Sequence, residues 1–518
     1  NRVSHTRPPA HGVEAVGTDR YDDGIIARWD FKELPGTTAY DPSGVAPAID
    51  LELQGDAVFM SNYGIDIPSG RAIATAEASR KLADVADGFL MHDRAIVARY
   101  DDSVVRVMNG APVFIRRARG YAPLPVGVPV STPKPLLAVG PHLKNTFSLV
   151  TGDVAFVSQH VGDLENVETL DHYREALLRF QALFSIEPEV VARDLHPGYL
   201  STRIADEMGL DRVIGVQHHH AHIAAVAGEH GVLEPVVGIA YDGTGYGDDG
   251  HTWGAELLLA DLTGYRRLAQ LRYAPMPGGD LAARTPWRVA AGYASLEPEL
   301  EACFASAFEG VPADERRIVA TQIDRGVNAP LASSMGRLFD AAAAVLGVRR
   351  GAAYEGQAAM ELEALARHWV AGSVDDSRDP SEVIGEGPVQ AHLPRIAFPV
   401  NALPGECAVV DPVPVLAELG ARAAAGEDAG LLAAAFHASI GEATVDLAAA
   451  ACGEHGVSRV ALGGGVFQNS LLQAIVGQGL VSRGLEVLRP ERLGPNDGAI
   501  SYGQAVIAAA RLADEQGR

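Results

Sequence analysis

The stretch Gln217-His218-His219-His220-Ala221-His222-Ile223-Ala224-Ala225 decides how this chain folds and what it can bind. The apolar run at 212–216 before it predicts a buried strand, and its Ala-rich continuation predicts a helix. On a helix, His218 and His222 share one face with their imidazoles about 6 Å apart. Such a pair can chelate one divalent cation, and imidazole suits zinc, iron, nickel or copper better than magnesium. We therefore predict a metal site here, with His219 and His220 on other faces in structural roles; packing alone is the alternative for all four.

The bulk composition limits the class of protein. The chain has 518 residues, 47% of them apolar and only 6% aromatic, which is typical of a tightly packed α/β protein with two to four domains. Its 42 basic and 66 acidic residues give a net charge of −24, which argues against nucleic acid or an anionic membrane as a main partner.

The three cysteines, Cys303, Cys407 and Cys452, are far apart and form no CxxC pair. This spacing disfavours a disulfide framework and predicts a reducing, cytoplasmic compartment. No apolar run reaches the roughly 18 residues that would cross a bilayer, and no signal-peptide core is found at the first residues. The sequence starts without Met, as a fragment would.

Two basic features suggest anion binding. Arg116, Arg117 and Arg119 place three guanidiniums in four positions, and such forks match phosphate or carboxyl oxygens. The alternative is a solvated surface strand paired with Asp101 and Asp102. After a Pro-rich run at 123–135 that reads as a linker, a predicted hairpin carries Lys144 near its tip, where it could contact phosphate or simply be an exposed turn lysine.

Polar residues also follow predicted buried strands, where ligands of α/β proteins bind. Asp194 follows the strand at 190–192, and Asp242 follows the strand at 236–240 and precedes a predicted turn, Gly243-Thr244-Gly245. The carboxylate could complete a metal site while glycine N–H groups approach a phosphate; a plain glycine-rich hairpin is the alternative.

Near the C-terminus, a strand at 459–462 runs into Gly463-Gly464-Gly465 and a helix start, which is typical of a nucleotide-binding junction. Asn469 could hydrogen-bond an adenosine there. Asp497 precedes the last helix, where it could cap that helix or bind a metal.

Many motifs in a fixed order now carry a resemblance. From about residue 83 to 512 the chain resembles the hydrogenase-maturation carbamoyltransferase (HypF) family. The matching motifs are His92-Asp93-Arg94, Asp101-Asp102-Ser103-Val104, Arg116-Arg117-Ala118-Arg119-Gly120-Tyr121, Ser158-Gln159-His160, Asp194-Leu195-His196-Pro197, Gln217 to His222, Asp242-Gly243-Thr244-Gly245, Ser333-Ser334-Met335-Gly336-Arg337, Tyr354-Glu355-Gly356-Gln357 and Gly464-Gly465-Val466-Phe467-Gln468-Asn469.

The resemblance implies an α/β fold, with a two-lobed actin-like (TsaD-like) transferase domain preceded by a partial YrdC-like segment. We expect an atypical segment at 1–81, the end of the YrdC-like domain plus linker at 82–130, lobe I with the metal site at 131–270, and lobe II with the adenosine-binding glycine loop at 271–518.

The resemblance also implies a reaction and its residues. The family's YrdC-like domain makes carbamoyl-adenylate from carbamoyl phosphate and ATP with Mg, and the transferase domain passes the carbamoyl group to the C-terminal cysteine of a partner maturation protein. The expected metal ligands, for iron or zinc, are His218, His222, Asp242 and Asp497, and Lys144 joins His218, His222 and Asp242 as catalytic. The expected nucleotide-binding residues are Gly243, Thr244, Gly245, Ser334, Glu355, Gly463, Gly464, Gly465 and Asn469, with Arg116, Arg117 and Arg119 for carbamoyl phosphate or adenylate.

The chain departs from the family pattern in its first part. The family's acylphosphatase domain, its paired zinc motifs and the first half of the YrdC-like domain are not recognisable. We therefore expect adenylation to be weakened or absent while transfer is intact. The alternatives are a carbamoyltransferase acting on a small-molecule hydroxyl and a nucleotide-binding scaffold without turnover; the histidine cluster disfavours a sugar kinase.

Overall fold

The computed structural model describes residues 38–39, 51–52, 79–80, 82–84, 98–108, 110–372, 396–401 and 405–517. The chain divides into two compact units, Asn1–Asp101 and Asp102–Arg518. In the first unit, β1 (Thr38–Ala39) pairs with β2 (Leu51–Glu52) in antiparallel register. Most of the segment expected to be atypical, 1–81, and the motif at 92–94 lie outside the described residues.

A four-stranded sheet opens the second unit, in the order β6-β5-β7-β8. Its strands are β5 (Val126–Ala138), β6 (Ser148–Val157), β7 (Val190–Asp194) and β8 (Arg212–Val216), with β5 antiparallel to β6 and parallel to β7. Because successive side chains of a strand face opposite ways, Leu136 and Leu137 enter different cores. One core contains α2 (Val167–Phe184) and α3 (Leu200–Glu207), and the other contains α4 (His218–Glu229) and the last helix, α15 (Ile500–Gly517).

The predicted linker at 123–135 is wrong, because most of it belongs to β5. Its register with β6 shifts between Gly127 and Thr132 and again between Thr132 and Leu136. Pro129, Pro133 and Pro135 lie in these interruptions, where a residue without an N–H group costs no ladder bond. The composition therefore resembled a linker although the segment is an irregular strand.

A nine-stranded sheet forms the centre of the remaining residues, with the path β14-β15-β11-β10-β9-β16-β17. β13 joins β10 and β12 off this path. The strands are β9 (Val236–Tyr246), β10 (Thr252–Ala260), β11 (Tyr265–Leu271), β12 (Ala274–Pro275), β13 (Leu331–Ser334), β14 (Val400–Asn401), β15 (Ala408–Val410), β16 (Arg459–Gly463) and β17 (Glu486–Leu488).

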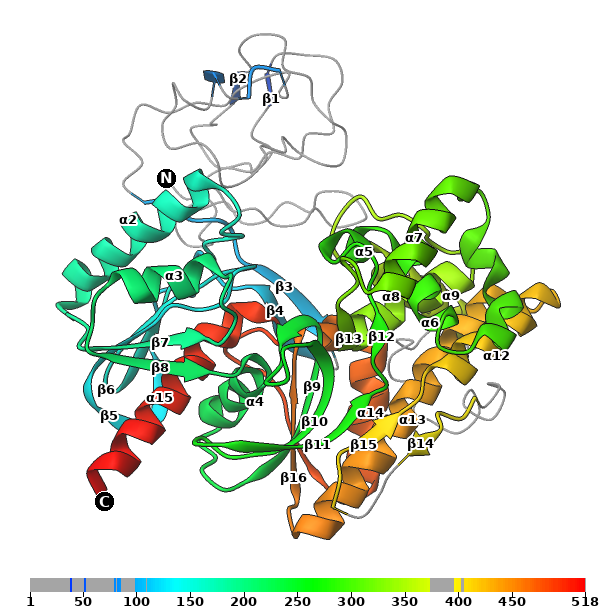
Figure 1. Cartoon of the computed structure of the whole chain (residues 1–518). Coiled ribbons are helices and arrows are strands. Elements are labelled where there is room, and N and C mark those ends of the chain that lie inside the picture. The colour runs from blue at the N-terminus through cyan, green and yellow to red at the C-terminus, as the bar shows by residue number, and fades with distance from the viewer. Residues whose placement is uncertain are drawn as a thin grey trace, which may run out of the picture. The chain divides into compact units, whose positions relative to one another are not determined.

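Ala-rich helices gather beside this sheet, on the right of Figure 1. Small side chains let these helices pack closely, and Ala341 to Ala344 are fully buried. The helices of this part of the chain are α5 (Asp280–Arg284), α6 (Pro286–Ala294), η1 (Pro298–Phe308), α7 (Ala313–Arg325), α8 (Met335–Val345), α9 (Gln357–Gly372), α12 (Val413–Ala424), α13 (Ala429–His455), η2 (Gly465–Gln468) and α14 (Ser470–Ser482). The short η3 (Asp497–Ala499) lies apart from them, beside α4 and α15.

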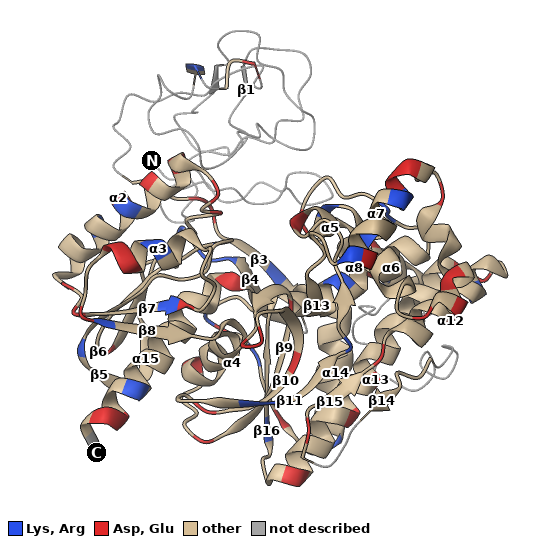
Figure 2. Ribbon diagram, viewed as in Figure 1, with Lys and Arg blue, Asp and Glu red and all other residues tan. Residues whose placement is uncertain are grey.

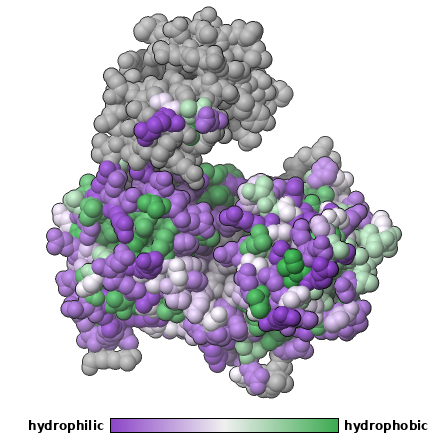
Figure 3. Space-filling view, turned by 45° about the horizontal axis from the view of Figure 1, so that its top comes forward, coloured by the Kyte–Doolittle hydropathy of each residue, from purple (hydrophilic) through white to green (hydrophobic). Residues whose placement is uncertain are grey.

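Helix α13 is the one described helix that is long and apolar enough to cross a membrane. Most of its apolar window is buried inside the fold, as in the core helix of a globular domain, so the match is weak evidence for a span. Exposed large apolar side chains, such as Val107, Leu178 and Ile318, lie on separate elements. The face in Figure 3 accordingly shows scattered hydrophobic patches among hydrophilic residues.

The hairpin of β3 (Val104–Met108) and β4 (Ala111–Arg116) completes the second unit. Its Arg106 reaches the start of α14, where it donates to Ser470 Oγ at 3.0 Å and pairs with the buried Glu363 at 3.2 Å. The hairpin thus lines the same region as residues more than 350 positions later.

Candidate metal centre and adjoining cavity

Four side chains form a compact cluster between the two sheets. One ligand atom from each of His218, His222, Asp242 and Asp497 lies within 4.8 Å of all the others. Asp242 Oδ2 lies 3.3 Å from Nε2 of His218 and 3.2 Å from Nε2 of His222, and Asp497 Oδ1 lies 3.7 and 3.6 Å from the same nitrogens. Donors around a tetrahedral cation at 2.0–2.2 Å are separated by about 3.4 Å, so these spacings fit one metal ion.

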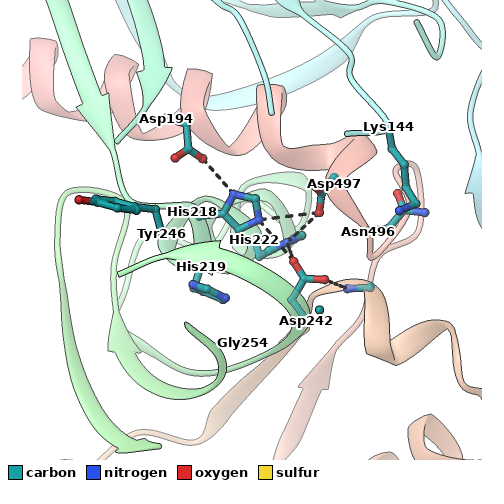
Figure 4. Close-up of polar contacts among 12 residues, drawn as sticks. Lys144, Asp194, His218, His219, His222, Asp242, Tyr246, Gly254, Asn496 and Asp497 are labelled. Atoms are coloured by element: carbon teal, nitrogen blue, oxygen red, sulfur yellow. Dashed lines mark hydrogen bonds and ion pairs between the residues drawn. The ribbon is translucent and has the colours of Figure 1, made fainter. Parts of the chain in front are cut away.

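Distant segments bring these groups together, as Figure 4 shows. The two histidines lie one turn apart on α4, with ring centroids 5.1 Å apart, as predicted. The helix begins there because Gln217 caps it, its side chain accepting from the N–H of His220 at 2.8 Å. Asp242 comes from β9 and Asp497 from η3, just before α15.

The cap prediction for the last helix needs one correction. Asn496, and not Asp497, accepts a hydrogen bond from the N–H of Gly498 at 3.0 Å and begins η3. The Asp497 carboxylate is therefore directed at the imidazoles, which leaves it for metal ligation.

Asp194, at the end of β7, supports the cluster from behind. Its Oδ2 lies 2.9 Å from Nδ1 of His218, and both side chains are fully buried. Because a carboxylate accepts, Nδ1 carries a proton, and in the neutral form of the ring Nε2 has the lone pair that a metal ion would need. A carboxylate behind a histidine is the arrangement that orients imidazoles in metal sites.

The electrostatics also favour a cation. Burial alone would lower the pKa of His218, but its contacts with Asp194, Asp242 and Asp497 outweigh burial and raise that pKa well above the ordinary value. Burial would likewise raise the pKa of Asp242, but the two imidazoles hold it well below its usual range. Three carboxylates around two imidazoles favour positive charge, which protonated rings or a divalent ion held by this nitrogen and oxygen donor set would supply.

The predicted glycine turn at 243–245 is extended strand in the structure. β9 continues to Tyr246, and the hairpin turns at Gly247–Gly250. Glycine is needed at Gly245 for space, since a Cβ there would lie 2.4 Å from His219 and 2.8 Å from His218. Gly464 has φ +98°, and a Cβ would lie 2.1 Å from the carbonyl oxygen of Tyr241. Both glycines therefore allow backbone to pass close to the cluster.

A cavity of about 440 Å³ adjoins the cluster. Asp242 and Asp497 lie on its wall, so a ligand inside it would reach a bound metal. Of the other residues predicted for nucleotide or catalysis, Lys144, Gly243, Thr244, Glu355, Gly465 and Asn469 line the cavity. Lys144 and Glu355 both line the cavity, and the Lys144 ammonium pairs with the Glu355 carboxylate at 2.6 Å.

The remaining predicted residues lie elsewhere. Ser334 caps α8 and donates to the carbonyl oxygen of Gly243 at 2.6 Å, so it acts on the cavity through the backbone. Gly245, Gly463 and Gly464 lie beside the metal cluster or behind the cavity wall, outside its lining.

The arginine cluster is not one site. Arg116 and Arg117 line a separate, much smaller pocket with His160. Arg117 also donates to the carbonyl oxygens of Tyr121 and Leu124 at 2.9 Å, which commits much of its guanidinium to the protein. Arg119 forms an exposed pair with Asp102 at 3.0 Å, the surface alternative named above.

Sequence reasoning missed four of the charged residues that line the cavity: Arg106, Arg337, Asp340 and Glu363. Asp340 is 2% exposed, and burial raises its pKa to about 6 despite Arg337 at 3.1 Å. Its carboxylate was detectable only as an acid in an otherwise apolar helix, Leu338 to Val345. No local sequence pattern marked Arg106 or Glu363 as a cavity residue, because their contact joins distant parts of the chain.

Charge on the surface helices is mixed. Figure 2 shows Lys and Arg beside Asp and Glu on α2, α7 and α15. Such helices do not present a basic face, and the absence of nucleic acid among the partners stays a prediction.

Comparison with known protein families decides the relationship. The model of the carbamoyltransferase Kae1-like domain, second subdomain, matches residues 238–504, and that of the HypF Kae1-like domain matches residues 131–229. The chain belongs to the HypF carbamoyltransferase family. This confirms the predicted membership and the mixed α/β fold with a TsaD-like (Kae1-like) domain; the YrdC-like segment stays a prediction.

Individual HypF relatives agree with this assignment. Carbamoyltransferase HypF2 of Cupriavidus necator is 44% identical over 470 residues, covering 86% of this chain and 55% of the relative. A HypF homolog of the same organism is 38% identical over 394 residues, covering 74% of this chain and 93% of the relative. The chain spans about half the length of the other curated relatives it matches.

Solved HypF structures match as well. A full-length HypF crystallised in a phosphate- and nucleotide-bound form superposes with a TM-score of 0.78 at 39% identity, covering 90% of this chain and 57% of that one. HypF of T. kodakarensis gives a TM-score of 0.75 at 32% identity, with 87% and 57% covered.

Proposed function

We propose that this chain transfers a carbamoyl group from carbamoyl-adenylate to the C-terminal cysteine thiol of a partner hydrogenase maturation protein, in the cytoplasm. The main observation behind the proposal is that Asp242 and Asp497 belong both to the candidate metal cluster and to the lining of the cavity. A ligand in the cavity would have its phosphate or carbamoyl end beside the cluster.

The metal ligands would be His218, His222, Asp242 and Asp497, with iron or zinc favoured by the imidazole pair. When bound, the cation supplies a Lewis acid that polarises a phosphate or carbamoyl oxygen. The carboxylate of Asp242 is oriented by Gly465, whose N–H lies 3.2 Å from Oδ1. Asp194 keeps the His218 imidazole in the tautomer that can bind.

The cavity residues would hold the adenylate. Lys144 would bring positive charge toward the phosphate, and its pKa is raised because Glu355 and Asp497 outweigh the effect of burial. Asn469 would donate to the adenosine, and Asp340 would accept from ribose hydroxyls. In the reaction, the thiolate sulfur bonds to the carbamoyl carbon, the bond from that carbon to the adenylate oxygen breaks, and AMP leaves with the electron pair. Holding donor and acceptor together supplies much of the rate.

We propose that the adenylation half-reaction is weak or absent in this chain. That half-reaction consumes carbamoyl phosphate and ATP with Mg. Arg116 is the member of the arginine cluster whose placement best suits an anion, in the pocket with His160. Pyrophosphate release at the full rate of a complete HypF would contradict this part alone.

Supplying carbamoyl-adenylate from a separate adenylating enzyme tests the transfer half directly. The purified chain, loaded with iron or zinc, is incubated with the carbamoyl-adenylate and a peptide ending in cysteine. Mass spectrometry then detects whether the peptide gains one carbamoyl group. A matched peptide ending in serine and a set of small hydroxyl compounds are the controls. Modification of the hydroxyl compounds alone would favour a small-molecule transferase, and nucleotide binding without any product would favour a scaffold.

A further inference from the structure

The amide of Asn469 has a fixed orientation. This residue caps α14, and its Oδ1 accepts from the N–H of Leu472 at 3.0 Å. Since an N–H group can meet only an acceptor, the oxygen must lie on that side. The atom of Asn469 that lies 2.9 Å from Nε2 of His437 is therefore the amide nitrogen, Nδ2.

The protonation of His437 follows from this contact. An amide nitrogen donates, so Nε2 of His437 must accept and Nδ1 must carry the proton. Nδ1 lies 2.7 Å from the carbonyl oxygen of Ala433, one turn earlier on α13, and donates to it. The two contacts require the same neutral tautomer, and burial lowers the pKa of His437, which favours that neutral form.

His437 has no direct access to a ligand. Its side chain is fully buried, with the rings of Phe339 and Phe436 at 5.2 and 6.2 Å, and it is absent from the cavity lining. Asn469, by contrast, lines the cavity, and the second N–H of its amide makes no hydrogen bond with the described residues.

We infer that His437 is a positioning residue of the nucleotide site, which fixes the Asn469 amide so that its free N–H is presented to the ligand as a donor. The inference rests on the proposed nucleotide binding. The ligand atom it selects is a hydrogen-bond acceptor, such as a ribose oxygen or a purine ring nitrogen.

The test compares two substitutions of His437 by calorimetric titration with ATP. His437→Leu removes the acceptor, and ATP affinity should fall about three- to tenfold, as expected for losing one oriented hydrogen bond. His437→Gln keeps an acceptor oxygen of similar reach, and its affinity should stay within about twofold of the unsubstituted protein. His437→Met replaces the leucine variant if that variant does not fold.

His230→Leu is the matched control. It removes an imidazole that contacts the carbonyl oxygen of Arg489 at 2.7 Å, at the opposite end of α4 from the metal cluster, and should leave ATP affinity unchanged. The inference is overturned if both His437 variants bind ATP as the unsubstituted protein does, or if both bind equally weakly. Failure of the unsubstituted protein itself to bind ATP would instead overturn the proposed nucleotide function, and the inference with it.

Discussion

The Nδ1 atom of His218 lies 2.9 Å from Oδ2 of Asp194, and neither side chain is exposed. Asp194 lies outside the four-residue cluster, so it acts on a metal only through this imidazole. Asp194→Asn should lower affinity for zinc or iron about 10- to 100-fold, because the amide orients the ring less strongly than a carboxylate does. Competition with a chromophoric chelator measures the change. Asp206→Asn, on the exposed partner of Arg193, is the control.

Metal removal should destabilise the protein. A ligand that binds the folded state at 100 times its dissociation constant contributes about 2.7 kcal/mol, so chelation should lower the melting temperature and zinc or iron should restore it. His222→Ala should abolish the metal-dependent part. His455→Ala, at the exposed end of α13, should retain it. Equal metal-induced shifts in the His222 variant and the unsubstituted protein would contradict the site.

Two glycines of one strand should respond differently to alanine. Gly245→Ala should cost about 1–3 kcal/mol and weaken metal binding, because its Cβ would lie 2.4 Å from His219 and force α4 away. Gly243→Ala is the control, since its Cβ would meet only Arg337, at 3.6 Å. Urea denaturation and metal titration of the pair measure both effects.

A buried ion pair should matter more than an exposed one. Glu256 is fully buried, lies 2.5 Å from Nε of Arg267, and accepts from Ser333 at 3.1 Å. Glu256→Gln removes the buried counter-charge of the guanidinium and leaves only Asp249, at 3.7 Å and partly exposed, so it should cost about 3–5 kcal/mol in the free energy of unfolding. Asp314→Asn, which breaks an exposed pair with Arg317, should cost about 1 kcal/mol or less.

His160 should make stability depend on pH. Burial, followed by the nearby Arg116, lowers its pKa to about 4 from the ordinary 6.5. A histidine with a depressed pKa in the folded state contributes stability that is complete above pH 6.5 and lost as pH falls toward 4, here at most about 3 kcal/mol. His160→Gln should flatten that part of the profile, measured by urea denaturation between pH 4 and 8. An unchanged slope would contradict the assignment.

The structure brings the four predicted metal ligands together, and the sequence could indicate this because the strongest determinants are local. The spacing of His218 and His222 needs only a helix, and the strand-end positions of Asp194 and Asp242 need only the rules of α/β folds. It predicted the cavity less well. Arg106 and Glu363 meet through tertiary contacts with no local pattern, and the roles of Asn496 and Asp497 depend on the backbone conformation at the end of a loop.

The glycine and proline signals were ambiguous for a physical reason. Gly245 serves close approach within a strand and not a turn, and the prolines of β5 fall where the ladder is interrupted. The presence of a glycine or proline shows only that the backbone tolerates that residue. Its structural role depends on the residues packed around it in the fold.

The last helix, α15, packs on β5 and α4 and supplies Tyr502, Val506 and Ala509 to the core that it shares with the first sheet. During synthesis on the ribosome, that sheet would therefore stay without one of its covering layers until α15 itself has left the ribosome. Early-terminated chains should expose this apolar face and become substrates for chaperones, and a tag is better placed beyond the helix than within it.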